Sequence, residues 1–512
     1  MKPIGVVVSG SSPVNVPIHV YKGCENQVME EAFVIIKDDE KNMEYFGVIR
    51  SLRMNDPLLN QSQRSSIIDN PELAKQGREV VFETSYVRVL GVLQPNGQLI
   101  PPRQPPAPRS EVYLVESPGD VKLALETGLE LGEHKFSRIK IPLKPEALKY
   151  HVGVVGATGT GKSKLVVALV NEVLEKTDWK VLVFDHSGQD YVNVPGFEGK
   201  VLDASEITLD LESIAEYLKK EISAKEAGED ALYVSLILYI LSKGDLRKFS
   251  ESQDRSITEF AKGVEGKVEV SISENKVGEA LEKMPVLLET VDLEEEMKKV
   301  KWETSSLVKL FETVINIVAG KSTSKRKYVT FMSLQKKYIE SLNKRRISSR
   351  DILERLEKDR LVVLDLSTVR QEERKYVVYS VLRRIWDRID EAKKPVNTLV
   401  VVDEAHNYAC YQGCYPSSSI IERTAREGRK WGLGLVLASQ RMIDFSTDVR
   451  NNINTFFFSK LQTPGDLDNL KGVLDLGGVE YDDLAILATR EFYFAGLGNP
   501  LKYPVLIEVK QV

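Results

Sequence analysis

Residues 151–176, HVGVVGATGTGKSKLVVALVNEVLEK, decide the fold of this chain. The stretch begins as an apolar run, passes through a glycine-rich turn and continues with apolar residues at helical spacing. A glycine-rich turn that opens a helix directs backbone N–H groups at an anion, and only glycine lets the backbone approach so closely. The pattern Gly-x-x-x-x-Gly-Lys-Ser therefore predicts a strand, a phosphate-binding loop and a helix.

This loop predicts a binding site for ATP and Mg²⁺. Lys162 is expected to neutralise the β- and γ-phosphates, and the Ser163 hydroxyl is expected to bind the metal ion. The expected nucleotide contacts are Gly156, Gly159, Thr160, Gly161, Lys162, Ser163 and Lys164. A glycine-rich turn without a ligand is the other interpretation, and the preceding strand and following helix weigh against it.

Four further apolar segments indicate that the loop belongs to an α/β core. They are WKVLVFDHSG (179–188), RLVVLDLS (360–367), NTLVVVDEAHN (397–407) and GLGLVLASQ (432–440). Apolar runs without polar alternation are typical of parallel strands that helices cover on both faces. We therefore expect an α/β fold with a parallel-type sheet.

Changes in the residue pattern divide the chain into predicted domains. Residues 4–92 contain short strands separated by polar, glycine or proline breaks, which favours a small β-barrel. Five prolines among residues 101–108 favour a semi-rigid linker. We expect a barrel at 1–100, a linker and lead-in at 101–139, an ATPase core with a C-terminal extension at 140–207 plus 351–512, and a helical insertion at 208–350.

Two acids follow the apolar run of the segment LVVVDEAHN (399–407). We expect this strand to lie next to the strand of the phosphate loop, so that its carboxyl end delivers both acids to the phosphates. Asp403 suits the metal ion, and Glu404 suits a base that activates an attacking water. The pair favours hydrolysis, although a surface turn can also carry two acids. His406 would either sense the substrate or only cap and pack the turn.

Polar residues around the strand 432–440 add to this site. Gln440 follows the strand and is well placed to sense the γ-phosphate. Arg429, with Arg426 as second choice, favours an arginine finger that reaches the nucleotide of a neighbouring subunit. A solvated helix face is the alternative for both arginines.

The composition, with 42% apolar and 28% charged residues, is typical of a globular protein. The N-terminus lacks the apolar region of a secretory signal, and the apolar run 231–241 is too short to cross a bilayer. We therefore expect a cytoplasmic protein without a membrane segment. Three cysteines, Cys24, Cys410 and Cys414, cannot build a disulfide framework or a zinc site, and we expect reduced thiols.

Four motifs together resemble the HerA family, which belongs to the HerA/FtsK superfamily of RecA-like P-loop ATPases. They are GATGTGKS (156–163), DEAHN (403–407), REGRKWGLGLVLASQR (426–441) and GLGNPLKYPVLIEV (496–509). The resemblance covers most of the chain and implies a RecA-like core, an N-terminal HAS-barrel and a helical insertion. It also implies that Lys162 and Ser163 are the Walker A pair and that Asp403 and Glu404 are the Walker B pair.

The resemblance implies an ATP-dependent DNA translocase or helicase. Family members form hexameric rings around duplex DNA, and they often act with a nuclease such as NurA in DNA end processing and double-strand break repair. The formal net charge of this chain is −5, yet residues 321–350 hold ten Lys or Arg against one acid. Candidate DNA contacts, chosen from charge alone, are Lys325, Arg326, Lys327, Arg345 and Arg346, which could equally face solvent or a partner.

The chain departs from the family pattern at two places. The family's Asp-x-His-Gly-Glu-Tyr motif reads DHSGQDY (185–191) here, which leaves the role of this loop open. Where some members carry an arginine before the histidine at 151, this chain has Tyr150, so that Lys149 or Arg138 would have to substitute. Two other functions share such a core: a nucleotide-dependent scaffold for a nuclease or other effector, and a conjugation- or secretion-type coupling ATPase.

Overall fold

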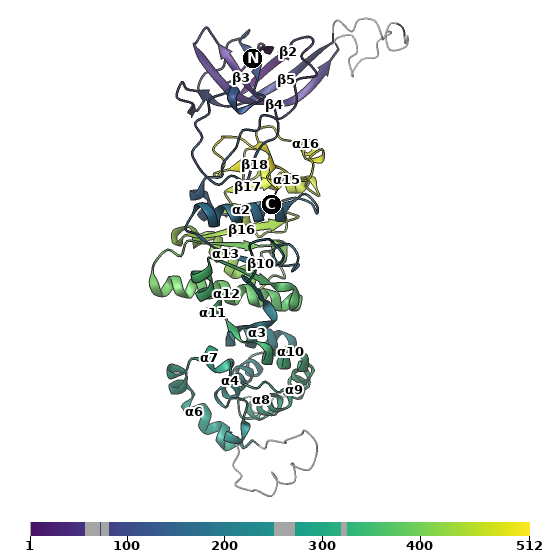
Figure 1. Cartoon of the computed structure of the whole chain (residues 1–512). Coiled ribbons are helices and arrows are strands. Elements are labelled where there is room, and N and C mark those ends of the chain that lie inside the picture. The colour runs from purple at the N-terminus through teal and green to yellow at the C-terminus, as the bar shows by residue number, and fades with distance from the viewer. Residues whose placement is uncertain (1, 57–71, 73–80, 250–271, 319–324, 512) are drawn as a thin grey trace. The chain divides into compact units, whose positions relative to one another are not determined.

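The chain folds into two compact units, seen here in a computed structural model that describes residues 2–56, 72, 81–249, 272–318 and 325–511 (Figure 1). The first unit comprises Met1–Val183, Pro395–Cys414 and Ile421–Val512, and the second comprises Phe184–Lys394 and Tyr415–Ile420. The second unit thus includes more than the predicted helical insertion, and the predicted domain boundaries stay a prediction.

The first seven strands form one sheet in the first unit, and six of them close into a barrel, while β6 pairs only with β5 (Figure 1). Their order is β2-β1-β7-β3-β4-β5-β6, and pairing of β2 with β5 closes the barrel. Alternate residues of β2, such as Val16 and Ile18, are fully buried, as period-two side-chain alternation requires. The strands are β1 (Pro3–Val7), β2 (Asn15–Val20), β3 (Phe33–Asp38), β4 (Met43–Asn55), β5 (Phe82–Leu93), β6 (Leu99–Ile100) and β7 (Glu111–Leu114).

The barrel confirms the small β-barrel in the predicted fold class. One strand of this sheet, β7, lies within the segment 101–139 that was predicted to be a linker and lead-in. β7 pairs with β1 and with β3, and Val112 at its second position is fully buried. A strand of four residues carries too short a pattern to be recognised beside a run of prolines.

The core sheet of the first unit surrounds the strand of the phosphate loop. From β10, whose last two residues enter the second unit, the strand order is β10-β15-β16-β9-β17-β18-β19-β8. The strands β15, β16, β9 and β17 run parallel, whereas β18, β19 and β8 pair in antiparallel fashion. The bounds are β8 (Gly132–His134), β9 (Val152–Val155), β10 (Lys180–Asp185), β15 (Thr398–Val402), β16 (Leu433–Ser439), β17 (Thr455–Phe458), β18 (Glu491–Gly496) and β19 (Val505–Val509).

The parallel strands confirm the predicted α/β core, but one detail of the prediction is wrong. We predicted that the strand ending at Asp403 lies next to the strand of the phosphate loop, whereas β16 lies between β15 and β9. An apolar run shows that a strand is buried and does not show which strand it pairs with. Because β15, β16 and β9 run parallel, their carboxyl ends still meet at one edge of the sheet.

Helices complete the first unit. The helix α2 (Lys162–Lys176) follows the phosphate loop, and the side chains of Leu165, Leu169 and Val173 are fully buried. The remaining helices of this unit are α13 (Ser417–Glu427), which begins in the second unit, α14 (Thr447–Asn452), α15 (Pro464–Lys471) and α16 (Tyr481–Ala485).

The second unit is mainly helical among its described residues (Figure 1). Its helices are α3 (Leu211–Ile222), α4 (Ala227–Leu241), α6 (Glu274–Thr290), α7 (Leu293–Met297), α8 (Thr304–Val318), α9 (Lys325–Leu334), α10 (Lys336–Ser341), α11 (Ser349–Asp359) and α12 (Gln371–Ala392). It also holds two parallel strand pairs, β11 (Val201–Asp203) with β14 (Leu361–Asp365), and β12 (Ile207–Thr208) with β13 (Ile347–Ser348).

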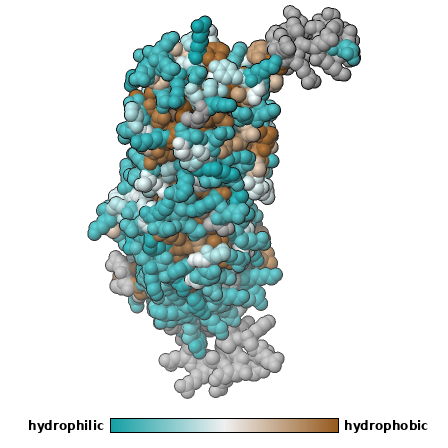
Figure 2. All heavy atoms as spheres, turned by 45° about the horizontal axis from the view of Figure 1, so that its top comes forward, coloured by the Kyte–Doolittle hydropathy of each residue, from teal (hydrophilic) through white to brown (hydrophobic). Residues whose placement is uncertain are grey.

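Hydrophilic residues cover most of the face seen in Figure 2, with smaller hydrophobic areas between them. Within the part of the chain that the structure describes, no helix has both the length and the apolar character needed to cross a membrane. The apolar helix α4 has its Leu236, Ile237 and Ile240 side chains fully buried, which accounts for the apolar run at 231–241.

Candidate nucleotide-binding site

The phosphate loop connects β9 to α2. Gly159 and Gly161 adopt φ angles of 82° and 97°, in the left-handed region where glycine is favoured. The Lys162 ammonium lies back over the loop and donates to the carbonyl oxygens of Gly156, at 2.9 Å, and of Ala157, at 3.3 Å. The loop therefore has the backbone shape of a phosphate cradle, and its lysine lies within the curve of that cradle.

Three neighbouring segments hold the loop in this shape. The Gly156 and Ala157 amides donate to the carbonyl oxygens of Ser439, at 3.2 Å, and Lys460, at 2.7 Å. The amide of Arg490, the residue before β18, donates to the Thr160 carbonyl at 2.8 Å. These contacts were not predicted, since no motif in the sequence points to residue 490, and a pairing between distant segments leaves no local signal.

The predicted base and sensor lie in contact after β15 and β16. The Gln440 side-chain amide donates to the Glu404 carboxylate at 3.1 Å. The amide oxygen of the same Gln440 accepts a hydrogen bond from the Thr158 hydroxyl of the phosphate loop, at 3.2 Å. Gln440 therefore joins the phosphate loop to the carboxylate, which is the connection that a residue reporting the γ-phosphate requires.

The backbone of Glu404 adopts an uncommon conformation. Its φ of 43° lies in the left-handed region, where residues other than glycine are rare and which is enriched at functional sites. The turn Ala405–Asn407 follows at once, and its Asn407 side chain donates to the Glu404 carbonyl at 3.1 Å. This turn aims the Glu404 carboxylate away from the direction of β15 and toward Gln440.

The contacts of His406 indicate its tautomer. The Asn407 side-chain amide donates to Nε2 at 3.2 Å, so Nε2 is the acceptor and the proton resides on Nδ1. Nδ1 lies 3.3 Å from the Glu404 carboxylate and 3.3 Å from the Ser439 hydroxyl. These contacts join His406 to Glu404 and Ser439, and the two roles predicted for His406, sensing the substrate or capping and packing the turn, stay predictions.

Asp403 and Ser163 are the candidate metal ligands. Asp403 is 4% exposed and directly follows β15, while Ser163 is half-buried in the first turn of α2. Carboxylate and hydroxyl oxygens are hard ligands of the kind that Mg²⁺ prefers. The donor set of these two residues is therefore compatible with Mg²⁺ held against the phosphates of a nucleotide.

Arg429 lies at the opposite edge of the sheet. It belongs to the turn Gly428–Trp431, which precedes β16, whereas Gln440 follows β16. A strand of seven residues separates the two, a length of about 23 Å. The Arg429 guanidinium stacks over the Tyr150 ring, 5.1 Å from its centroid, and Arg426 pairs with Asp448 at 2.9 Å.

A buried histidine positions the arginine segment. His151 is 1% exposed; its Nδ1 accepts from the Leu435 amide and its Nε2 donates to the Ala425 carbonyl, both at 3.0 Å. Burial lowers the pKa of His151 to about 4, so the ring is neutral, as this pair of contacts requires. The histidine thus ties the residue before Arg426 to strand β16.

The variant loop 185–191 has a structural explanation. Its Asp185 carboxylate accepts hydrogen bonds from the Gly188 and Tyr191 amides, at 2.9 Å each, and from the Ser187 amide at 3.1 Å. His186 contacts Arg374 through its ring and its carbonyl oxygen. The loop is therefore held by its own aspartate, with or without the glutamate of the family motif.

The two candidates for the missing arginine occupy different surroundings. Arg138 pairs with Glu133, at 3.0 Å, and with Glu508, at 3.1 Å. Glu508 also pairs with Arg490, whose amide supports the phosphate loop. Arg138 is thus near the phosphate loop of its own chain, whereas Lys149 lies beside Tyr150 at the edge that carries Arg429.

The candidate DNA contacts also differ from one another. Arg345 is 3% exposed, donates to the Ile207 carbonyl at 2.7 Å and forms a buried ion pair with Glu373. The structure therefore does not support Arg345 as a DNA contact, because a run of charges in sequence does not show which member is buried. Arg326, Lys327 and Arg346 are exposed, and Lys325 is half-exposed.

The expectation of reduced thiols is wrong for two cysteines. Cys410 and Cys414 form a disulfide, and Cys24 is a free thiol. The bond closes a short loop six residues beyond Glu404, where backbone pairing of Cys410 with Phe445 joins the segments that follow β15 and β16. A four-residue spacing allows a disulfide only when the turn brings the two Cα atoms within reach, and the sequence does not reveal that turn.

A phosphate loop, an acid pair and a glutamine at one edge of a parallel sheet define this chain as a P-loop ATPase. The chain belongs to the HerA family, since the family described as Helicase HerA, central domain, matches residues 129–385. This finding confirms the resemblance noted from the four sequence motifs.

Individual relatives match over nearly the whole chain. Over 514 residues the chain is 24% identical to the DNA double-strand break repair helicase HerA of Pyrococcus furiosus, covering 93% of this chain and 87% of the relative. Its identity to the helicase of the same name from Sulfolobus acidocaldarius is 22% over 527 residues, with 99% and 92% covered. Among solved structures, the bacterial conjugative coupling protein TrwB matches with a TM-score of 0.46 and 16% identity, over 76% of this chain and 91% of that one.

Proposed function

We propose that this chain is an ATP-driven DNA translocase or helicase that acts as a hexameric ring, as is typical of its family, in DNA end processing and double-strand break repair. One observation carries the proposal. Glu404 and Gln440 lie beside the phosphate loop, whereas Arg429 lies about one strand length away, at the other edge of the sheet. A site that uses Arg429 is therefore completed by a second copy of the chain.

The proposed nucleotide site assigns a role to each residue. The loop amides and Lys162 bind the phosphates of ATP, and Ser163 with Asp403 holds Mg²⁺. Glu404 accepts a proton from the attacking water, and its carboxylate is oriented by Gln440 and His406. Arg429 of the next subunit stabilises the negative charge that develops on the transferred phosphoryl group.

The first experiment measures ATP hydrolysis with and without duplex DNA. We expect DNA to stimulate hydrolysis by the wild-type chain. Lys162→Ala removes a phosphate contact, and Glu404→Gln removes the base, which should lower kcat about 100-fold or more. Glu391→Gln, at an exposed glutamate near the end of α12, is the matched control and should leave the rate unchanged. A wild-type assembly whose hydrolysis does not respond to any DNA would contradict the proposal.

The helical unit supplies candidate DNA contacts. We propose that Lys325, Arg326, Lys327 and Arg346 bind backbone phosphates, with support from their exposure and positive charge. Replacing one of them with Ala should lower DNA affinity for all sequences alike and reduce the steepness of its salt dependence by about one charge. Arg345 serves as the internal contrast, because its replacement should lower stability instead.

A nuclease partner of the NurA type is part of the proposal, with support from membership of the HerA family alone. Co-purification of the chain with such a nuclease, and degradation of DNA ends only in the presence of ATP and both proteins, would support it. Nuclease activation by the Glu404→Gln variant at the wild-type level would favour the alternative of a nucleotide-dependent scaffold.

A further inference from the structure

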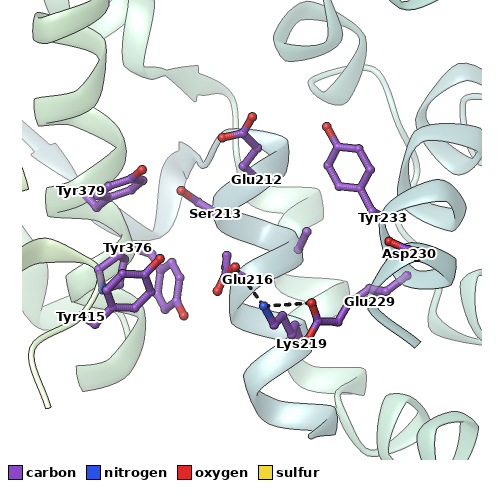
Figure 3. A pocket seen from close by; sticks show the side chains of 13 residues that line it. Glu212, Ser213, Glu216, Lys219, Glu229, Asp230, Tyr233, Tyr376, Tyr379 and Tyr415 are labelled. Carbon is purple, nitrogen blue, oxygen red and sulfur yellow. Dashed lines mark hydrogen bonds and ion pairs between the residues drawn. The ribbon is translucent and has the colours of Figure 1, made fainter. Parts of the chain in front are cut away.

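A pocket of about 360 Å³ lies within the second unit, between α3, α4 and α12 (Figure 3). Tyrosines line both of its walls. Tyr376 and Tyr379 project from α12 beside Tyr415, and Tyr233 projects from α4 on the other side of α3 (Figure 3). Aromatic rings that face an open space offer their negative faces to a cation.

The Tyr376 hydroxyl has no hydrogen-bond partner among the described residues. Tyr376 is 2% exposed, and its hydroxyl makes no hydrogen bond with any other described residue. Burial raises the pKa of Tyr376, so the group stays an uncharged hydroxyl. A tyrosine hydroxyl that lines a pocket without a hydrogen bond can take a donor or acceptor supplied by a ligand.

Carboxylates surround the same space. Four acids and one base line the pocket, namely Glu212, Glu216, Glu229, Asp230 and Lys219. The Lys219 ammonium reaches from α3 to Glu229 on α4, at 3.2 Å, and to Glu216, at 3.3 Å (Figure 3). The Asp230 carboxylate forms no ion pair or hydrogen bond within the described part of the chain. The pocket thus already holds one cationic side chain and keeps an excess of negative charge.

We propose that this pocket binds an arginine side chain of a partner protein. A guanidinium is planar, stacks on tyrosine rings and donates in a fork that matches carboxylates. The half-buried Tyr379 ring supplies the stacking face, Glu216 supplies a carboxylate and the Tyr376 hydroxyl oxygen accepts one N–H, while Asp230 adds negative charge at the other wall of the pocket. Nucleic acid and phosphate are unsuited to the site, because its acids would repel them.

The proposal concerns a site in the second unit and does not depend on the ATPase proposal. Every residue that it uses lies in that unit, whereas the phosphate loop, Glu404 and Gln440 lie in the first. A loss of peptide binding with unchanged ATP hydrolysis would therefore concern only this pocket. A loss of ATP hydrolysis with unchanged peptide binding would concern only the nucleotide site.

The test uses the full chain and a capped peptide, Gly-Arg-Gly-Arg-Gly, that carries a neutral dye. Fluorescence anisotropy should show saturable binding. The same peptide with citrulline, which keeps the shape of arginine without its charge, should bind at least about tenfold more weakly. Equal binding of the arginine and citrulline peptides would overturn the proposal.

Variants locate the binding within the pocket. Tyr379→Ala should weaken binding about fivefold, while Tyr379→Phe, which keeps the ring, should retain it. Asp230→Asn should also weaken binding. Lys219→Met removes the internal cation that competes for Glu216 and Glu229, so it should strengthen binding.

Two matched controls lie outside the pocket. Tyr86→Ala and Asp39→Asn replace an exposed tyrosine and an exposed aspartate of the barrel, and both should bind the peptide like the wild type. Circular dichroism establishes that each variant is folded. Control variants that weaken binding as much as Tyr379→Ala and Asp230→Asn, or pocket variants that leave it unchanged, would refute the assignment.

Discussion

Replacing Arg429 with Ala tests whether the catalytic site is shared between two subunits. Within its own chain the Arg429 side chain contacts Tyr150 and no phosphate-loop residue, at the edge of the sheet where β16 begins. About 23 Å of strand separates it from Gln440, which is more than an arginine side chain can span. Arg429→Ala should therefore leave nucleotide affinity unchanged and lower kcat about 1,000-fold, the smaller end of the range for an arginine finger.

Tyr150→Ala measures how much of that effect comes from placing the arginine. An exposed cation–π contact contributes about 0.5 to 1 kcal/mol, so kcat should fall only about two- to fivefold. Tyr150→Phe keeps the ring and should behave like the wild type. A fall after Tyr150→Ala as large as that after Arg429→Ala would show that the turn as a whole had lost its structure.

Mixing two inactive variants distinguishes a shared site from one within a single chain. In rings assembled at random from equal amounts of Arg429→Ala and Glu404→Gln subunits, about a quarter of the interfaces combine an intact Glu404 with an intact Arg429 of the neighbour. Steady-state ATP hydrolysis, measured after subunit exchange, should recover to about that fraction of the wild-type rate. No recovery in rings shown by native mass spectrometry to be mixed would refute the reasoning, because a site within one chain is never intact in such rings.

Three further perturbations test the framework of the fold. Arg50 is the buried ion-pair partner of Glu31, whose pKa is raised to about 7 by burial. Arg50→Met leaves Glu31 without this partner and should lower the free energy of unfolding, measured by urea denaturation, by about 3 to 5 kcal/mol. Adding Glu31→Gln should restore most of that loss. The pKa of His151 is lowered to about 4, so its contribution to stability is complete above pH 6.5 and is lost as the pH falls toward 4. The free energy of unfolding should fall by about 3 kcal/mol over this range. A His151→Gln variant whose stability has the same pH dependence as the wild type would contradict this prediction. Reduction of the Cys410–Cys414 disulfide should lower stability by about 2 kcal/mol, measured as a fall in Tm after treatment with dithiothreitol, and Cys410→Ser should be insensitive to that treatment.

Much of the nucleotide site follows from local sequence. The phosphate loop needs glycine at positions where the backbone takes positive φ, and Gly159 and Gly161 do so. The acids after an apolar run, and the glutamine after another, reach one edge of the sheet because the strands are parallel. These predictions succeed because each depends on a short stretch of chain and on a rule that holds for any parallel sheet.

Other features depend on which distant segments meet. β16 lies between β15 and β9, Arg490 supports the phosphate loop from the position before β18, and Arg345 is buried against Glu373. None of these leaves a pattern within its own stretch of sequence. The sequence around a charged residue does not show whether its side chain faces water or an ion-pair partner.

The sequence by itself determined the phosphate loop, the acid pair, the barrel and the family, because these features repeat local patterns of glycine, apolar and acidic residues. Only the tertiary structure decided that Gln440 contacts both Thr158 and Glu404, that Arg429 faces away from its own phosphate loop, and that four tyrosines and four acids line one pocket. The physical reason is that side-chain chemistry acts over a few ångströms. The residues within that distance are set by strand order and helix packing, which join parts of the chain that lie hundreds of residues apart.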